Sequence, residues 1–215
     1  MQLATEILER NTQPDSRKYI DDLKEDIGMM TRLTDELLQF ARAEAAPEPV
    51  KLAPVNVAEA AQAAVRRENL GGADVRLEID SSIQVQANSE YLMRSLANLL
   101  RNAIRYAGDQ GPIVVFANKE NQQIRISVAD SGPGVPEEAF DKIFTPFFRL
   151  EFSRDRQTGG TGLGLAIVRS CIEACGGTVE CRNRGPQGWK LRSLSLQHSG
   201  PGLALLCHSL EPPGG

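Results

Sequence analysis

The stretch Gly159-Gly160-Thr161-Gly162-Leu163-Gly164-Leu165-Ala166-Ile167-Val168 places four glycines within six residues, directly before an apolar run. Glycine has no Cβ and tolerates positive φ, so a ligand can approach such a backbone closely. The apolar run suits a helix, whose first free N–H groups and dipole favour an anion. The stretch therefore predicts a phosphate-binding loop, although by itself it fits a flexible loop before a core helix equally well.

The composition is that of an ordinary soluble globular protein, with 215 residues, 41% hydrophobic and 24% charged. A net charge of −4 gives no reason to propose nucleic acid or an anionic membrane as a partner. No apolar run approaches the roughly 20 residues of a membrane helix, and residues 1–6 do not resemble a signal peptide. We therefore expect a cytoplasmic location, no nucleic-acid partner and no membrane segment in this chain.

The first 44 residues predict a helical hairpin. A first helix ends near Leu8, a turn covers residues 11–16, and an amphipathic pattern runs from Arg17 to Ala43. Its apolar seam advances in steps of three and four through Ile20, Leu23, Ile27, Met30, Thr34, Leu37 and Ala41. Two helices cannot bury so wide a face alone, so we expect a homodimeric four-helix bundle. A hairpin folded back onto its own domain remains the alternative.

The remainder divides into a linker at 45–54, a second domain at 55–196 and an atypical tail at 197–215. The pattern of the second domain predicts an α+β fold, a two-layer α/β sandwich. The tail is expected to be disordered, and a shifted reading frame would explain its composition. The expected helices are Val57–Asn69, Glu90–Tyr106 and Gly162–Cys175, and the expected strands are Val75–Ile79, Ile83–Gln86, Ile113–Asn118, Gln123–Asp130, Thr178–Cys181 and Trp189–Leu196.

Three polar side chains share one side of the helix expected at 90–106. Asn98 and Asn102 are four residues apart, and Arg105 follows three residues later. An amide oxygen can ligate Mg²⁺ and a guanidinium can pair with phosphate, so this side suits a Mg²⁺–phosphate complex. A solvated polar face is the alternative.

Asp130-Ser131-Gly132-Pro133-Gly134 ends an expected strand. A carboxylate held there could accept hydrogen bonds from an exocyclic amine such as adenine N6, while the glycines let the backbone approach a flat ligand. An ordinary Asp-Ser-Gly turn would give the same pattern.

An aromatic segment, Phe144-Thr145-Pro146-Phe147-Phe148-Arg149, precedes the polar stretch 151–158. We interpret the aromatics as an anchor and the polar stretch as a mobile lid. Among its arginines, Arg154 and Arg156 fit solvated lid residues, and we favour a phosphate contact only for Arg149.

These four pieces stand in the order of the N, G1, F and G2 boxes, and the chain resembles the bacterial sensor histidine kinases of the GHKL (Bergerat-fold) group. Residues 147–160 are also similar to the RstB branch of those kinases. The matching motifs are Asn98-Leu99-Leu100-Arg101-Asn102-Ala103, Asp130-x-Gly132-x-Gly134, Phe144-x-Pro146-Phe147 and Gly160-Thr161-Gly162-Leu163-Gly164-Leu165.

The resemblance implies a Bergerat ATP-binding domain after a dimerisation hairpin, with ATP and Mg²⁺ as cofactors and a response regulator as partner. It implies Asn102 as the Mg²⁺ ligand and Asp130 on the adenine amine. The remaining implied contacts are Asn98, Arg105 and Arg149 near the phosphates, Tyr106, Gly132 and Gly134 around the base, and Gly160, Thr161, Gly162, Leu163 and Gly164 along the phosphate chain.

Two features of the sequence determine which activity we expect. GHKL hydrolases carry a glutamate where this chain has Asn98, and an amide cannot serve as a general base, so we expect slow ATP hydrolysis. The family's phosphoacceptor box is absent, and the only histidines, His198 and His208, lie outside any such context. We therefore expect phosphoryl transfer only to a histidine on another chain. The alternative is a nucleotide-binding dimerisation module that sequesters a response regulator or pairs with an intact kinase.

Overall fold

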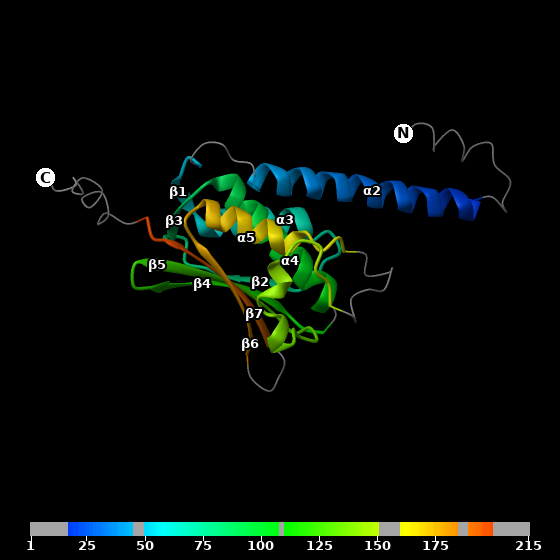
Figure 1. Cartoon of the computed structure of the whole chain (residues 1–215). Coiled ribbons are helices and arrows are strands. Elements are labelled where there is room, and N and C mark those ends of the chain that lie inside the picture. The colour runs from blue at the N-terminus through cyan, green and yellow to red at the C-terminus, as the bar shows by residue number, and fades with distance from the viewer. Residues whose placement is uncertain (1–16, 45–49, 108–109, 151–159, 185–188, 200–215) are drawn as a thin grey trace, which may run out of the picture.

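The computed structural model describes residues 17–44, 50–107, 110–150, 160–184 and 189–199 (Figure 1). Within these ranges lie four α-helices, seven strands and two short 3₁₀ helices. The helices are α2 (Arg17–Glu44), α3 (Val57–Glu68), α4 (Ser89–Ala107), α5 (Gly164–Ala174), η2 (Glu137–Ala139) and η3 (Lys142–Phe144). The strands are β1 (Ala53–Asn56), β2 (Val75–Glu78), β3 (Gln84–Ala87), β4 (Ile113–Glu120), β5 (Gln123–Asp130), β6 (Thr178–Arg184) and β7 (Trp189–Gln197).

A five-stranded sheet in the order β2-β4-β5-β7-β6 forms one layer, and α3, α4 and α5 cover one of its faces (Figure 1). β2 pairs with β4 in parallel, whereas the other pairs are antiparallel. β1 and β3 form a separate antiparallel pair. The expected two-layer α/β sandwich is therefore confirmed.

The last described strand lies inside the sheet. β7 pairs with β5 on one side and with β6 on the other, so the last predicted strand is present and is an interior strand. Its buried leucines, Leu194 and Leu196, lie opposite Ile126 and Ile124 of β5 and face the helices. This row joins the core below α4.

Short polar side chains begin the helices that cover the sheet. Asn56 Oδ1 accepts the backbone N–H of Glu59 at 3.0 Å at the start of α3. Asn88 Oδ1 likewise accepts from Glu90 and Tyr91 at 3.1 and 3.2 Å at the start of α4. From there the predicted apolar stripe of α4 is buried against the sheet, through Leu92, Leu96, Leu99 and Ala103.

α2 crosses above the three covering helices and contacts α5 (Figure 1). Phe40 of α2 packs against a buried cluster formed by Leu163, directly before α5, and by Ile167 and Cys171 of α5. Several other large side chains of α2 are exposed, namely Tyr19, Leu23, Met30, Leu33, Leu37 and Leu38. The first helix expected in the hairpin lies outside the described residues, so α2 is the part of the hairpin that the structure describes.

Two strands extend beyond the expected limits of the second domain. Ala53 and Pro54, assigned to the linker, lie in β1 because β3 supplies a partner strand. Gln197, assigned to the tail, lies in β7, and the backbone N–H groups of His198 and Ser199 donate to Gln122 and Gln84. The sequence could not reveal these ends because each depends on a strand distant in the chain.

Among the described helices, none has both the length and the apolar character that crossing a bilayer requires. Cys171 and Cys175 are buried, as expected for small apolar side chains, and burial raises the pKa of Cys171 to about 11. The segments expected as lid and as most of the tail, 151–158 and 200–215, lie outside the described residues.

Candidate nucleotide-binding site

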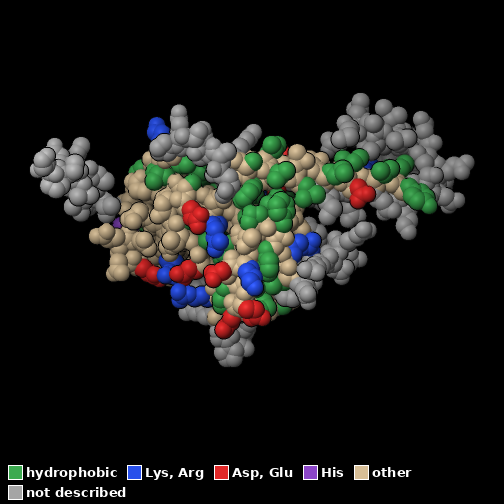
Figure 2. Space-filling view, viewed as in Figure 1, with side chains coloured by type: hydrophobic (Ala, Val, Ile, Leu, Met, Phe, Trp, Pro, Cys, Tyr) green, Lys and Arg blue, Asp and Glu red, His purple; other side chains and the backbone are tan. Residues whose placement is uncertain are grey.

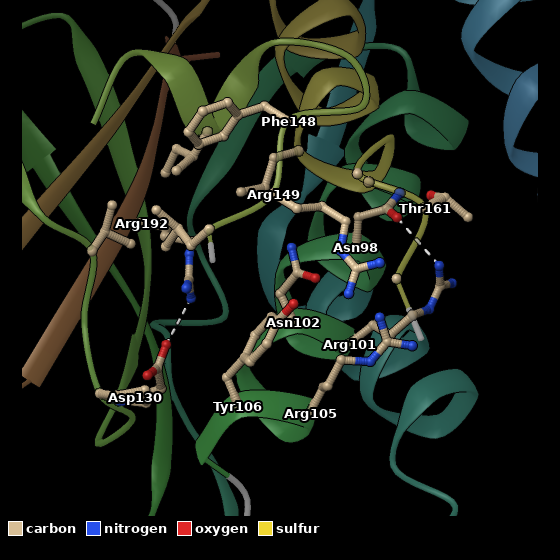
Figure 3. A pocket seen from close by; sticks show the side chains of 18 of the residues that line it. Asn98, Arg101, Asn102, Arg105, Tyr106, Asp130, Phe148, Arg149, Thr161 and Arg192 are labelled. Atoms are coloured by element: carbon tan, nitrogen blue, oxygen red, sulfur yellow. Dashed lines mark hydrogen bonds and ion pairs between the residues drawn. The ribbon is translucent and has the colours of Figure 1, made fainter. Parts of the chain in front are cut away.

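A pocket of about 900 Å³, open mouth included, lies at one end of α4. Its walls come from α4, the loop after β5, the segment after η3, the loop before α5, and single residues of α2 and β7 (Figure 3). Three of the four motifs predicted from the sequence contribute to these walls, and Phe148 and Arg149 directly after the F motif line the pocket as well.

Asn98 and Asn102 both line the pocket from α4, but their amides differ. Asn98 is buried, donates from Nδ2 to the Arg94 carbonyl at 3.0 Å, and accepts from Arg101 at 3.3 Å. Asn102 has no hydrogen-bond partner among the described residues, and its amide points toward the centre of the pocket (Figure 3). Asn102 therefore has the amide whose oxygen is available to a metal ion.

Arg101, between those two asparagines, is also a pocket residue. Its guanidinium donates to both carboxylate oxygens of Glu68 at 2.8 and 2.9 Å and lies 3.5 Å from Glu36 of α2. The hydrogen bonds to Glu68 raise the pKa of Arg101, although partial burial opposes them. The guanidinium is thus fixed as a cation at the mouth of the pocket.

Asp130 closes the deep end of the pocket and is only 1% exposed. Its Oδ1 accepts the backbone N–H of Gly132 at 2.9 Å, and its Oδ2 accepts Nη1 of Arg192 at 2.7 Å. Each oxygen keeps a second lone pair for a ligand. Asp130 is therefore a buried acceptor held in place by its neighbours, as the sequence predicted.

Two predicted contact residues do not line the pocket. A Cβ on Gly132 would lie 2.9 Å from the Tyr106 carbonyl oxygen, so this glycine serves the packing of its loop against α4. Leu163 is buried in the cluster beneath α5, and its backbone N–H donates to the Thr161 hydroxyl at 3.1 Å. The sequence pattern does not separate glycines that face a ligand from those that face protein.

The other predicted residues are brought together around the same space. The pocket is lined from several sides by Arg105, Tyr106, Gly134, Arg149, Gly160, Thr161, Gly162 and Gly164. Arg154 and Arg156 lie outside the described residues. Of the aromatic anchor, Phe144 is buried and Phe148 lines the pocket, whereas Phe147 is exposed and has a φ of 64°.

Sequence reasoning did not assign nine of the lining residues to the site, and three of the nine are charged, namely Glu36, Arg101 and Arg192. The signal for Arg192 was present, because strand alternation places it on the same face as Leu194 and Leu196. Arg101 follows Asn98 by three residues and shares its side of the helix. Nothing in the sequence indicates that Glu36 of α2 reaches this pocket.

The donor set fits a magnesium–nucleotide complex. An unengaged amide oxygen suits Mg²⁺, and the guanidinium groups of Arg101, Arg105 and Arg149 suit phosphate oxygens. Tyr106 offers an aromatic face, and Asp130 a buried acceptor for a base. The guanidinium groups of Arg101 and Arg105 lie on one side of the pocket, and the buried acceptor Asp130 lies on the other (Figure 3). This arrangement suits a ligand that has a charged portion at one end and a flat portion at the other.

The family described as histidine kinase-, DNA gyrase B-, and HSP90-like ATPase matches residues 87–200, over half of the chain. The chain belongs to this ATPase family. The match begins at the end of β3 and includes α4, α5 and the strands β4 to β7, and it contains every lining residue of the pocket except Glu36 of α2. The predicted relationship to the GHKL group is confirmed.

Within this ATPase family, the similar proteins are sensor histidine kinases. The chain is 32% identical to the signal transduction histidine-protein kinase BaeS of Escherichia coli K12 over 74% of its length and 35% of BaeS. It is 34% identical to the sensor protein RstB of the same organism, over 74% of this chain and 37% of RstB. The chain thus spans little more than a third of these relatives.

Solved structures of histidine kinases share the fold. The full-length ShkA crystal structure in complex with AMPPNP matches 91% of this chain and 42% of ShkA, with a TM-score of 0.71 and 28% identity. The crystal structure of ThkA in complex with the response regulator protein TrrA matches 91% of this chain and 55% of that chain, with a TM-score of 0.64 and 26% identity. The fold of this chain therefore has counterparts in such kinases.

Proposed function

We propose that the chain binds ATP with Mg²⁺ and supplies the catalytic part of a sensor histidine kinase, transferring the γ-phosphoryl group to a histidine of another chain. The observation that carries the proposal is the convergence of the unengaged Asn102 amide, three guanidinium groups and the buried Asp130 on one pocket. Positioning and charge neutralisation supply most of the catalysis in phosphoryl transfer. Such a site needs little else from the protein.

The residue at position 98 favours transfer over hydrolysis. Asn98 presents an amide whose NH₂ is already engaged with the Arg94 carbonyl and whose oxygen accepts from Arg101. An amide is too weak a base to accept a proton from water, so Asn98 cannot serve as a general base in the described pocket. ATP would therefore persist in the pocket until an acceptor histidine arrives.

The partners of the proposed kinase are a second copy of the chain and a response regulator. Hydrophobic side chains gather along α2, several of them exposed, and a second hairpin would cover them (Figure 2). The ThkA structure holds a response regulator, TrrA, which supports the same kind of partner here. A site that consumes ATP places the chain on the cytoplasmic side of any membrane to which a longer protein would attach.

A nucleotide-binding module without transfer activity is the second candidate. The histidine content of the sequence favours this candidate, because the two histidines, His198 and His208, do not lie in a phosphoacceptor motif. His198 lies beside β3, where its ring nitrogen Nδ1 is 3.1 Å from the Gln84 carbonyl oxygen, and it does not line the pocket. In this case the chain would sequester a response regulator or pair with an intact kinase.

Nucleotide binding is tested by calorimetric titration of the whole chain with a non-hydrolysable ATP analogue, with and without Mg²⁺. Binding is expected to be tighter with Mg²⁺, and Asn102→Ala should remove that difference because it deletes the proposed metal ligand. Asp130→Ala should weaken binding in both conditions. Asn118→Ala, on an exposed position of β4, is the matched control and should bind like the parent. Absence of binding by the folded parent would refute the proposal.

Transfer is then tested with γ-labelled ATP and an isolated hairpin that carries a phosphoacceptor histidine. Acid-labile label on the hairpin supports the kinase, whereas nucleotide binding without label supports the module. Label on this chain itself would contradict transfer to another chain.

A further inference from the structure

The loop that follows β5 supplies Pro133, Gly134 and Val135 to the wall of the pocket. Its first part is held by Asp130, whose Oδ1 accepts the Gly132 N–H at 2.9 Å. Within the described part of the chain, no backbone–backbone hydrogen bond joins this loop to another segment. The far end of the loop therefore depends on side chains to fix its backbone.

Asn183, in the edge strand β6, contacts that far end. Its Nδ2 donates to the Val135 carbonyl oxygen at 2.7 Å, and its Oδ1 accepts the Val135 N–H at 3.5 Å. One carboxamide thus satisfies both backbone groups of a single residue, as a neighbouring strand would. Asn183 does not itself line the pocket, so any effect that it has on a ligand passes through Val135 and its loop.

A contribution to the strand or to the core does not account for an asparagine at this position. Asparagine is depleted in strands. Alternation places Asn183 on the same face of β6 as Val179 and the buried Cys181. The side chain of Val135 already packs against Cys181 in a hydrophobic cluster, and an apolar residue at position 183 would leave that cluster intact. What only the carboxamide adds is the orientation of the Val135 backbone.

The loop is thus held at two points, at Gly132 by Asp130 and at Val135 by Asn183. The two residues between these points line the pocket and lie next to Asp130 in sequence, which is the proposed acceptor for the base. A flat ligand that reaches Asp130 must fit against this wall, so the position of the wall limits how well a base can bind.

We propose that Asn183 is a positioning residue for the base end of the pocket, where it fixes the loop against which a purine lies while Asp130 accepts from it. The inference rests on the proposed nucleotide site and deepens it, since it assigns a residue outside the pocket to recognition of the base rather than of the phosphates.

The test compares two ligands, both with Mg²⁺, by calorimetric titration of the whole chain. The first is the non-hydrolysable ATP analogue, and the second is inorganic triphosphate, which offers similar charges but no base. Asn183 is exposed, so its hydrogen bonds have a modest effect. Asn183→Ala should weaken binding of the analogue by roughly three- to tenfold, the effect of about one hydrogen bond, and should leave the affinity for triphosphate unchanged.

Asn69→Ala is the matched control. Asn69 Nδ2 donates to the Ala73 carbonyl oxygen, and its Oδ1 accepts the Ala73 N–H, both at 2.8 Å. The same kind of paired contact is therefore removed from a loop that does not line the pocket. This variant should lose stability in chemical denaturation but keep the preference of the parent for the analogue over triphosphate.

A second variant at position 183 separates positioning from side-chain size. Asn183→Asp keeps the size of the side chain but loses the donor to the Val135 carbonyl oxygen, so it should lower the preference as Asn183→Ala does. Circular dichroism checks that each variant is folded. If Asn183→Ala does not fold, Asn183→Asp decides by the same measurement.

An unchanged preference in the folded variants, or an equal loss of affinity for both ligands, would overturn the inference and leave the proposed function intact. A similar loss of preference in Asn69→Ala would also overturn it, because general loosening would then explain the effect. A parent that binds triphosphate as tightly as the analogue would have no base contact to position, which is equally decisive against it. Failure of the folded parent to bind the analogue would instead overturn the proposed function, and this inference with it.

Discussion

Gly162 meets two demands at once in the loop before α5. Its φ is +78°, and a Cβ at this position would lie 2.7 Å from the carbonyl carbon of Phe147. The Gly162 carbonyl also accepts the Phe147 N–H at 3.0 Å. The aromatic segment and the glycine-rich loop, both of which line the pocket, are therefore joined backbone to backbone, and only glycine permits this contact.

Gly162→Ala should consequently weaken nucleotide binding as well as stability. Gly176→Ala is a matched control, because Gly176 has a φ of +71° but no atom within 4 Å of the added Cβ. The control should lose about 1–2 kcal/mol of unfolding free energy, the cost of a left-handed alanine, without losing affinity. Chemical denaturation and calorimetric titration measure the two effects. Equal affinities in both variants would contradict the role assigned to the Phe147 contact.

The sequence motifs predicted many of the residues that line the pocket but not which of their members face protein instead. Asn102 and Asp130 lie where the spacing of their motifs indicated. Gly132 and Leu163 belong to the same motifs yet face protein, since a motif records the need for a small or apolar residue without recording which neighbour creates that need. Arg192 was not predicted as a pocket residue because the sequence pattern of its strand indicated only that the strand pairs within the sheet.

Helix α2 reaches the pocket through one carboxylate. Glu36 accepts from the Thr161 hydroxyl in the glycine-rich loop and pairs with Arg101 at 3.5 Å. The carboxylate therefore sits beside the cationic wall that would face a triphosphate. Docking of α2 and binding of a polyanion both use Arg101 and Thr161, so each of the two events should weaken the other.

Glu36→Gln removes the charge and should tighten binding of the magnesium–ATP analogue by roughly two- to fivefold, with a smaller gain at high salt. Glu68→Gln is the control, because Glu68 bonds the same Arg101 at 2.8 Å but does not line the pocket. That variant should not tighten binding. Titrations at two salt concentrations measure both, and weaker binding by Glu36→Gln would contradict the proposed competition.

Elements with strong local patterns were predictable, and those that depend on distant partners were not. The α4 stripe and the β4–β5 hairpin follow from periodicity and from the turn at residues 121–122. β1 exists only because β3 lies beside it, and the contact of α2 with α5 depends on a surface assembled from remote segments. Single-sequence periodicity contains no information about such pairings.

At the scale of the whole molecule, one core connects the sheet to its covering helices. Leu194, in the interior strand β7, is 1% exposed and belongs to this core. Leu194→Ala should cost about 2–5 kcal/mol of unfolding free energy, whereas Leu70→Ala, at an 88% exposed position, should cost little. Thermal melts report both, and similar melting temperatures for the two variants would contradict a core that includes β7.

The order of strands has a consequence for how the protein is made. Because β7 follows β5 and β6 in the sequence but lies between them in the sheet, both neighbours leave the ribosome with an open hydrogen-bonding edge. Arg192 belongs to the same strand. Until β7 has been translated, a nascent chain therefore lacks one wall of the pocket and is open to strand exchange with other chains.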